Sequence, residues 1–172
     1  MEIRTERLVL VPHGTKFLGS TYEYASDLEN TRYMINLPTD SLDDTSEYLE
    51  YVEKEWAKEI PLLYEFAITY EDQHVGSVGI DVDEERTTAE FGWCLSKKYW
   101  NRGFISEAAR AVLEFAINEL GVKHFIAHCD SENVASYSVM EKLGMERKDC
   151  YGGRKNRASD EERMELLYEL QL

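Results

Sequence analysis

The stretch from Ala89 to Met145 constrains the fold of this chain more than any other part of it. It reads AEFGWCLSKKYWNRGFISEAARAVLEFAINELGVKHFIAHCDSENVASYSVMEKLGM. Its hydrophobic pattern predicts an apolar strand, a basic loop with a glycine, a long amphipathic helix, a second strand and a second helix. Strand–helix–strand order predicts a crossover that brings the two strands side by side in parallel.

The long helix is the clearest element. From Ser106 onward the apolar residues recur at helical spacing and form one face, and Gly121 is a natural stop. These residues are Ala109, Val112, Leu113, Ala116, Ile117 and Leu120. The second helix is expected at Asn133–Leu143, where Gly144 ends it.

Similar signals predict the remaining elements. Strands are expected at Leu8–Val11, Leu63–Tyr70, His74–Asp81, Ala89–Leu95, Lys123–Cys129, Met145–Tyr151 and Met164–Leu172, with helices near Leu18–Ala25 and at Asp43–Lys58. The order βααβββαβαββ predicts one α/β (α+β) domain over residues 1–172, a mixed, mainly antiparallel twisted sheet flanked by helices. Gly76 and Gly79, inside a strand, indicate a bulge or a close backbone approach. The charged segment Gly152–Arg163 is expected to be a mobile loop.

The composition restricts the partners. The net charge is −15, which disfavours nucleic acid, because phosphate contacts need a basic face. The same charge would steer a cationic substrate, or simply keep the protein in solution. No apolar run reaches the length of a membrane span and no secretory signal is recognised, so we expect no membrane association. Three cysteines without CxxC spacing disfavour disulfides and zinc, and they favour a cytoplasmic protein without a metal.

Arg102–Ser106 (RGFIS) is the candidate phosphate-binding loop. Gly103 has no Cβ to block a phosphate, and the free N–H groups and positive dipole end of the following helix would face it. Lys97, Lys98 and Arg102 add local positive charge. An ordinary strand–helix connection with solvated bases fits the same residues, and the loop matches neither GxxxxGK[ST] nor GxGxxG.

Six short motifs are spread along the chain. They are RTERL at 4–8, GSVGI at 76–80, AEFGW at 89–93, YWNRGFISEA at 99–108, NVAS at 133–136 and EKLG at 141–144. At this spacing they resemble the GCN5-related N-acetyltransferase (GNAT) family, and within it the branch of ribosomal-protein N-terminal acetyltransferases. The resemblance covers nearly the whole chain. It implies an N-acetyltransferase that moves an acetyl group from acetyl-CoA to a primary amine by direct attack in a ternary complex.

The resemblance also implies roles for individual residues. The backbone of the strand ending at Leu95 would pair with the pantetheine arm, and one N–H there would stabilise the thioester oxygen. The cofactor-binding residues implied are Trp93, Cys94, Leu95, Arg102, Gly103, Phe104, Ile105, Ser106 and Asn133. Ser136 would protonate the leaving thiolate, directly or through water. By residue type alone, Asn133 also suits a helix N-cap, Ser136 a small packing residue and Cys94 a buried hydrophobe.

The chain departs from the family pattern at several positions. Trp100 stands where Gln or Arg is frequent, Asn101 replaces a frequent glycine and Ile105 a frequent small residue. Asparagine tolerates positive φ, which makes the loss of that glycine acceptable. Met140 occupies a position where many members carry a tyrosine acid, and it cannot donate a proton.

A base is needed because an ammonium has no lone pair. Deprotonating a lysine-like amine of pKa about 10.4 at neutral pH costs roughly 4.6 kcal/mol, whereas an α-amine near 7.8 costs only about 1 kcal/mol. With no histidine expected beside the motifs, Glu90 is the candidate base, acting directly or through water, although it also suits a solvated strand end. His124 and His128, about 13 Å apart on one strand, do not form a metal site.

The acceptor is therefore expected to be a protein N-terminal α-amine or another low-pKa small amine. Tyr33 and Tyr151 lie in segments that usually wall the acceptor site in this family. Met140 and the altered loop motivate the alternative, a non-catalytic acyl-CoA-binding sensor module. An unrelated ligand-binding protein is the third possibility. The assembly is expected to be a monomer or a homodimer.

Overall fold

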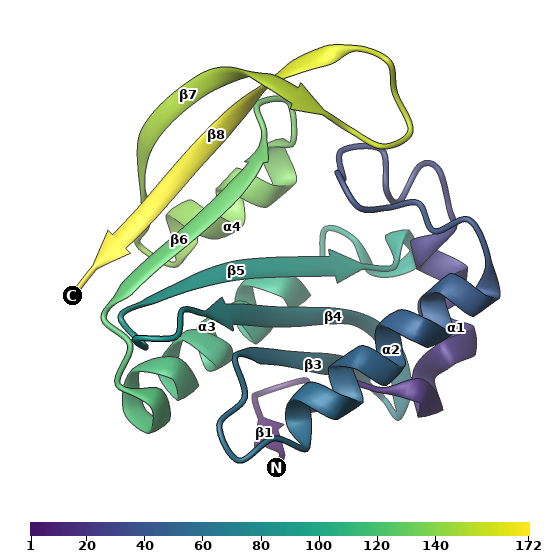
Figure 1. Ribbon diagram of the computed structural model, residues 1–172, viewed down its shortest axis with the longest axis vertical. Helices are drawn as coiled ribbons and strands as arrows, with labels where there is room; N and C mark the ends of the chain where they lie inside the picture. Colours follow the sequence, from purple (N-terminus) through teal and green to yellow (C-terminus); the bar gives the residue numbers. More distant parts are fainter.

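One eight-stranded sheet, in the order β1-β2-β3-β4-β5-β6-β8-β7, runs through the protein in the computed structural model, which describes residues 1–172 (Figure 1). Its strands are β1 (Ile3–Arg4), β2 (Val9–Pro12), β3 (Leu63–Tyr70), β4 (Gln73–Val82), β5 (Thr88–Leu95), β6 (His124–Asp130), β7 (Glu146–Lys155) and β8 (Glu162–Gln171). Only β5 and β6 pair in parallel. The predicted mixed, mainly antiparallel sheet with one parallel crossover is confirmed; only the two-residue β1 was not anticipated.

Helices cover both faces of the sheet. These are α1 (Leu18–Ala25), α2 (Leu42–Trp56), α3 (Phe104–Phe115) and α4 (Val134–Lys142), with short turns η1 (Thr15–Phe17) and η2 (Lys97–Tyr99) and a π-helical extension of α3, η3 (Ala116–Leu120). In Figure 1, α1 and α2 lie in front of the sheet, and α3 and α4 lie behind it. None of these helices combines the length and the hydropathy that crossing a bilayer requires.

Local sequence signals explain where the helices begin and end. The Ser41 Oγ caps α2 by accepting a hydrogen bond from the Asp44 N–H at 3.1 Å, which satisfies a donor that has no acceptor within the helix. Gly121, with φ of 75°, closes the α3–η3 helix as expected.

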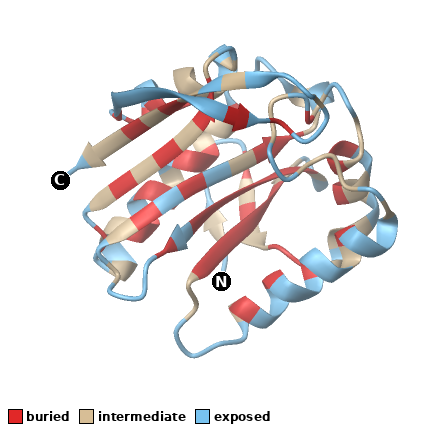
Figure 2. Ribbon diagram, turned by 45° about the horizontal axis from the view of Figure 1, so that its top comes forward, coloured by how far each residue is buried: buried red, intermediate tan, exposed pale blue.

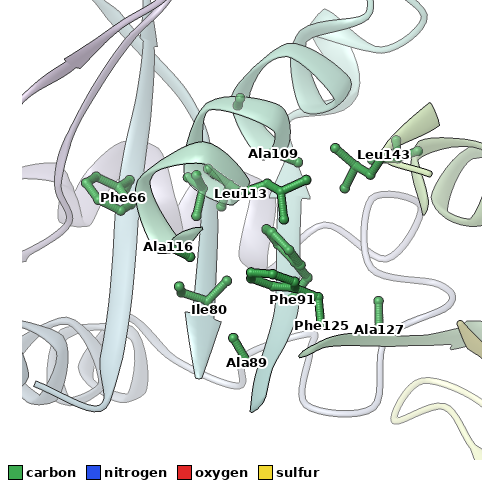
Figure 3. Packing of buried hydrophobic residues seen from close by; sticks show 14 of the residues in the cluster. Phe66, Ile80, Ala89, Phe91, Ala109, Leu113, Ala116, Phe125, Ala127 and Leu143 are labelled. Atoms are coloured by element: carbon green, nitrogen blue, oxygen red, sulfur yellow. The ribbon is translucent and has the colours of Figure 1, made fainter. Parts of the chain in front are cut away.

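The core lies between α3 and the sheet (Figure 3). Ala109, Val112 and Leu113 pack from the helix against Phe91 on β5 and Phe125 on β6, and all of them are buried. Ala109 and its neighbour Ala108 leave room on the helix for the large aromatic rings on the strands. This packing holds β5 and the start of α3 in a fixed relation, and the loop between them is therefore fixed as well.

The segment Gly152–Arg163 differs from the expected mobile loop. β7 continues to Lys155 and β8 begins at Glu162, so half of the segment belongs to the two strands of a hairpin, and the loop is limited to residues 156–161. The hairpin has a register shift between Tyr151 and Arg154 and a positive φ at Gly153. Charge alone suggested a loop, but an edge strand such as β7 is mostly solvent-exposed and tolerates charged residues (Figure 2).

Candidate active site

The two parallel strands separate halfway along their length. β5 and β6 are paired only from Thr88 and His124 to Phe91 and Ala127. Beyond that point β5 stays with β4 up to Leu95, whereas β6 stays with β8. Figure 1 shows the two strands diverging from their shared start. The inner edge of β5 is therefore left without a neighbouring strand.

The hydrogen-bond phase shows which groups line that edge. The Asp83 N–H donates to the Thr88 C=O (3.0 Å), and the Ser96 N–H donates to the Val75 C=O (2.8 Å). The backbone N–H and C=O groups of the even-numbered residues of β5 therefore point toward β4. The backbone of Trp93, an odd-numbered residue, faces the gap. The Leu95 C=O is occupied, because it accepts from Trp100 Nε1 at 2.9 Å and Asn30 Nδ2 at 3.1 Å. The gap thus presents a free N–H and C=O at Trp93.

Cys94 turns away from this edge. Its side chain is buried beside Tyr24 and Ala25 of α1. Burial, followed by the charge of Glu65, raises the pKa of the Cys94 thiol to about 12. A thiol that stays protonated is a poor nucleophile, which favours the interpretation of Cys94 as a small buried side chain.

The helix α3 begins without a side-chain cap. Gly103 is the N-cap residue with φ of 76°, and the first helical bond runs from Glu107 N–H to Gly103 C=O at 3.1 Å. The N–H groups of Phe104, Ile105 and Ser106 therefore have no acceptor within the helix. Asn101 adopts φ of 61°, as the sequence predicted for the residue that replaces a glycine. These free donors are the groups that an anion would bind.

Arg102 is the cation of this loop. Its guanidinium lies 5.4 Å from the centre of the Tyr99 ring and forms no ion pair. The expectation for the two lysines is wrong: Lys97 pairs with acids at 2.8 Å in the segment after α1, and Lys98 pairs with Glu23. Sequence proximity suggested a basic cluster, but acids from α1 and the segment after it neutralise both ammonium groups.

Arg7 braces the same loop from the N-terminal segment. It donates to the Arg102 carbonyl at 2.9 Å, forms an ion pair with Glu107 at 2.7 Å, and lies over the Phe104 ring. The hydroxyl of Thr5 donates to Glu107 at 2.6 Å. The RTERL motif contains both Thr5 and Arg7. Their contacts with the loop join residues about a hundred positions apart, which the sequence alone does not connect.

Asn133 caps α4. Its Oδ1 accepts from the Ser136 N–H at 3.2 Å, and its side-chain amide N–H₂ has no protein partner. The predicted capping role is therefore observed, and half of the amide remains for a ligand. Ser136 is half-buried in the first turn of α4, whereas Met140 is 1% exposed and belongs to the core. The thioether of Met140 cannot serve as an acid.

A histidine does lie beside Glu90, contrary to the expectation. His128 Nδ1 on β6 is 2.7 Å from Glu90 Oε1 on β5, at the point where the two strands begin to separate. The parallel pairing, which the sequence could not place in register, brings His128 to the carboxylate.

The two predicted acceptor residues occupy different places. Tyr33 lines a cavity of about 270 Å³ between the segment after α1 and the β7–β8 loop. Tyr151 on β7 is 40% exposed, and burial together with the charges of Glu165, Asp149 and Glu90 raises its pKa. Of the two tyrosines, Tyr151 is therefore the one whose pKa responds to the charge of Glu90.

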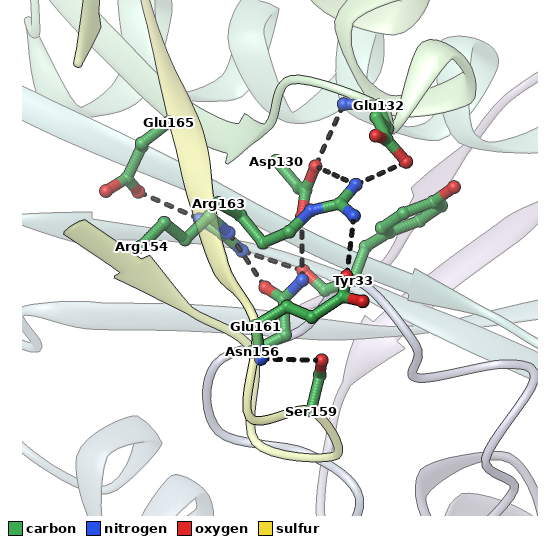
Figure 4. A network of polar contacts seen from close by, with 9 residues as sticks. All are labelled: Tyr33, Asp130, Glu132, Arg154, Asn156, Ser159, Glu161, Arg163 and Glu165. Carbon is green, nitrogen blue, oxygen red and sulfur yellow. Dashed lines mark hydrogen bonds and ion pairs between the residues drawn. The ribbon is translucent and has the colours of Figure 1, made fainter. Parts of the chain in front are cut away.

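A polar network ties the β7–β8 loop to the end of β6 (Figure 4). Asp130, fully buried, accepts from Asn156 Nδ2 at 2.6 Å and from the Arg163 guanidinium at 3.2 Å. Its carbonyl accepts from the Asn133 N–H at 2.9 Å. The Arg154 guanidinium donates to the Tyr33 carbonyl at 2.7 Å. The network thus connects the loop that carries Asn133 with the segment that carries Tyr33.

A histidine cluster beneath α1 gives a pH-dependent stability. Burial, followed by the nearby His13, lowers the pKa of His74 to about 4. Between pH 6.5 and 4 the unfolded chain takes up a proton that the folded protein does not, so stability falls as the pH falls. We expect the free energy of unfolding to drop by about 2.5 kcal/mol from pH 7 to pH 4.5 on this account. Urea titrations at several pH values would measure this dependence. In His74→Gln the free energy of unfolding should fall less between pH 7 and pH 4.5, whereas a control variant, His124→Gln, should keep the wild-type pH dependence.

Comparison with known proteins identifies the class of this fold and site. Residues 7–146 match the family described as the acetyltransferase (GNAT) domain. The chain belongs to the GNAT family of acetyltransferases, which confirms the resemblance seen in its motifs.

Individual relatives agree with this. An uncharacterized N-acetyltransferase, YnaD of Bacillus subtilis (strain 168), is 32% identical over 151 residues, covering 88% of this chain and 86% of that protein. The crystal structure of a GNAT-family acetyltransferase from Bacillus anthracis superposes with a TM-score of 0.83 at 29% identity, covering 99% and 98% of the two chains. The ribosomal L7/L12 α-N-protein acetyltransferase RimL, in complex with coenzyme A, reaches a TM-score of 0.86 at 12% identity, covering 100% and 98%. That last likeness concerns the fold alone.

Proposed function

We propose that this acetyltransferase moves the acetyl group of acetyl-CoA directly onto a primary amine in a ternary complex. The separation of β5 and β6 carries the proposal, because it leaves the backbone of Trp93 free for an amide-bearing chain such as the pantetheine arm. The RimL structure contains coenzyme A, which supports the same ligand class here.

The residues of the loop fit the diphosphate end of that ligand. The uncapped N–H groups of Phe104, Ile105 and Ser106 would bind its oxygens, and Gly103 leaves room for their approach. Arg102, without a carboxylate partner, would add a charge-assisted hydrogen bond. The otherwise acidic surface would repel this anion, so a local uncompensated cation matters here.

The thioester end fits the gap. The Trp93 N–H would donate to the thioester oxygen, where negative charge develops during the transfer. The free amide N–H₂ of Asn133 would hold a pantetheine carbonyl, and Ser136, in the first turn of α4, would pass a proton to the leaving sulfur. Acetyl-CoA itself supplies an activated acyl group.

The acceptor is proposed to be an amine of modest pKa, such as a protein N-terminal α-amine. Such an amine costs only about 1 kcal/mol to deprotonate at neutral pH, against roughly 4.6 kcal/mol for a lysine-like amine. Its site would be the face of the sheet that carries Glu90 and Tyr151.

Thermal shift with acetyl-CoA and thiol release on an amine panel test the function together. The panel is a serine-initiated peptide, spermidine, lysine and an aminoglycoside. We expect stabilisation by acetyl-CoA and thiol release on at least one amine. Stabilisation without thiol release would favour an acyl-CoA sensor module, and no stabilisation would overturn both functions.

Substitutions at Asn133 test the placement of the pantetheine. Asn133→Asp keeps the cap of α4 but loses the side-chain N–H₂, so the KM for acetyl-CoA should rise about tenfold, the equivalent of roughly 1.4 kcal/mol. Asn133→Ser also keeps the cap and should behave alike. If both variants keep the wild-type KM and only Asn133→Ala raises it, Asn133 is a cap and nothing more.

A further inference from the structure

The place where β5 and β6 separate carries a histidine–carboxylate pair on its open face. The Glu90 side chain points to the face of β5 on which Gly92 also lies. The His128 side chain points to the same face from β6, because its Nδ1 is 2.7 Å from Glu90 Oε1. The opposite face of both strands, with Phe91 and Ala127, is buried in the core. The pair is therefore held on rigid strands, while its side chains remain 26% (His128) and 46% (Glu90) exposed.

The contact determines which nitrogen of His128 is available. An ionised carboxylate only accepts hydrogen bonds, so Nδ1 carries the hydrogen that points at Glu90. The neutral ring then has its lone pair on Nε2, and no protein group bonds to Nε2. A histidine in this tautomer, fixed by a carboxylate, is arranged as a proton acceptor.

The neighbouring residue leaves room for an acceptor amine. The register of Phe91 with Ala127 puts His128 level with Gly92, and a Cβ on Gly92 would meet no atom within 4 Å. The next residue is Trp93, whose N–H faces the gap. The proton acceptor on His128 and the open space at Gly92 thus lie level with each other on the two strands. The free N–H of Trp93 is one residue further along β5.

We propose that His128 is the catalytic base of the acetyl transfer and that Glu90 is its positioning residue. The inference rests on the proposed function and replaces Glu90 as the group that takes the proton. The ammonium first loses one proton to solvent, so that the neutral amine attacks. As its nitrogen forms a bond to the acetyl carbon, the surplus proton of the adduct passes from nitrogen to His128 Nε2. The C–S bond breaks, its electron pair stays on sulfur, and the sulfur takes up a proton from solvent through Ser136.

Other ionisable groups share this face of the sheet. In the strand register, Asp81 on β4 lies opposite Glu90 on β5, and Tyr151 on β7 lies opposite Glu165 on β8. Glu165 is neutralised by Arg154 at 2.8 Å, whereas Glu169 is 3.4 Å from His124. Partial desolvation and the charges of Glu90, Glu65 and Glu55 raise the pKa of Asp81. Of these acids, Asp81 lies beside Glu90 without a cationic partner, and the two carboxyl groups favour an approaching cationic amine.

Kinetics of His128→Gln on the panel amine that wild type acetylates best test the proposal. We expect kcat to fall about a hundredfold, the lower range for loss of a general base, with the KM for acetyl-CoA changed less than twofold. The pH profile of kcat/KM should change its shape, because the group that accepts the proton has been removed. Glu90→Gln should cost about tenfold, and the double variant little more than His128→Gln alone, because the two residues act as a unit.

His124→Gln is the matched control, since it alters a histidine on the same strand outside the pair, and it should retain wild-type kinetics. A Glu90→Gln variant that is slower than His128→Gln, with the larger change in the pH profile, would restore Glu90 as the base. Equal, small losses in both variants would remove the pair from the chemistry.

Nitrogen NMR of the imidazole rings tests the geometry independently of any acceptor. The proposal expects the His128 ring at neutral pH as the Nδ1–H tautomer, and expects Glu90→Gln to shift it toward the Nε2–H form. A wild-type Nε2–H tautomer would overturn the proposal. If wild type releases no thiol with any amine but shows the Nδ1–H tautomer, the proposed function fails while the orienting contact stands.

Discussion

Asp130→Ala should destabilise the protein by about 3 kcal/mol, because it removes the acceptor of a buried polar network. The side chain of Asp130 is fully buried, while that of Arg163 is 17% exposed. Burial alone would raise the pKa of Asp130, but hydrogen bonds from the Glu132 N–H, Asn156 and Arg163 hold it below its usual value. Removing the carboxylate leaves the Asn156 amide without its acceptor and the Arg163 guanidinium without its only buried acid partner. Chemical denaturation would measure the loss.

Glu161→Ala is the matched control for this variant. Glu161 contacts the same guanidinium at 3.4 Å, but its side chain is 76% exposed. An exposed ion pair contributes at most about 1 kcal/mol, so this variant should stay close to wild type. Equal losses in both variants would contradict the importance of burial. Because Asp130 Oδ1 also accepts from the Glu132 N–H at 2.9 Å, directly before Asn133, the KM for acetyl-CoA should rise in Asp130→Ala alone.

Gly76→Ala should cost at least about 3 kcal/mol, through a clash between backbones. A Cβ on Gly76 would lie 2.3 Å from the Cys94 carbonyl oxygen and 2.9 Å from the Leu95 Cα. Neither atom belongs to a flexible side chain, so β5 must move away from β4. This is the end of β5 that borders the gap, so thermal stabilisation by acetyl-CoA should shrink as well.

Gly19→Ala serves as the control for the added methyl group. A Cβ there meets nothing within 4 Å, and the residue lies inside α1. Alanine is favoured over glycine in a helix interior by about 1 kcal/mol, so the melting temperature should stay or rise. If Gly76→Ala melts like wild type, the close approach of the two strands is not a constraint.

Much of the fold could be read from local patterns. The period of the residues from Ala109 to Leu120 predicted α3, and Leu63–Tyr70 was predicted with the bounds that β3 has. These patterns succeed because helix and strand periodicity follow from backbone geometry and the burial of one face. The hairpin of β7 and β8 was missed over Gly152–Arg163, because an exposed edge strand carries no apolar alternation.

The candidate site divides in the same way. Gly103, Asn133 and the start of α3 follow from local backbone chemistry, so the motifs located them. The pairing of Lys97 and Lys98 with acids, and the brace from Arg7, join segments that are distant in sequence. Such contacts depend on how the segments pack, and no pattern within either segment reveals them.

By itself, then, the sequence determined the order of the elements, the family and the loop that would bind phosphate, since each is encoded in neighbouring residues. The tertiary structure decided how far β5 and β6 stay paired, and hence that Trp93 is free and that His128 meets Glu90. Register between parallel strands is set by the packing of both strands on α3, a property of the assembled core that neither strand carries alone.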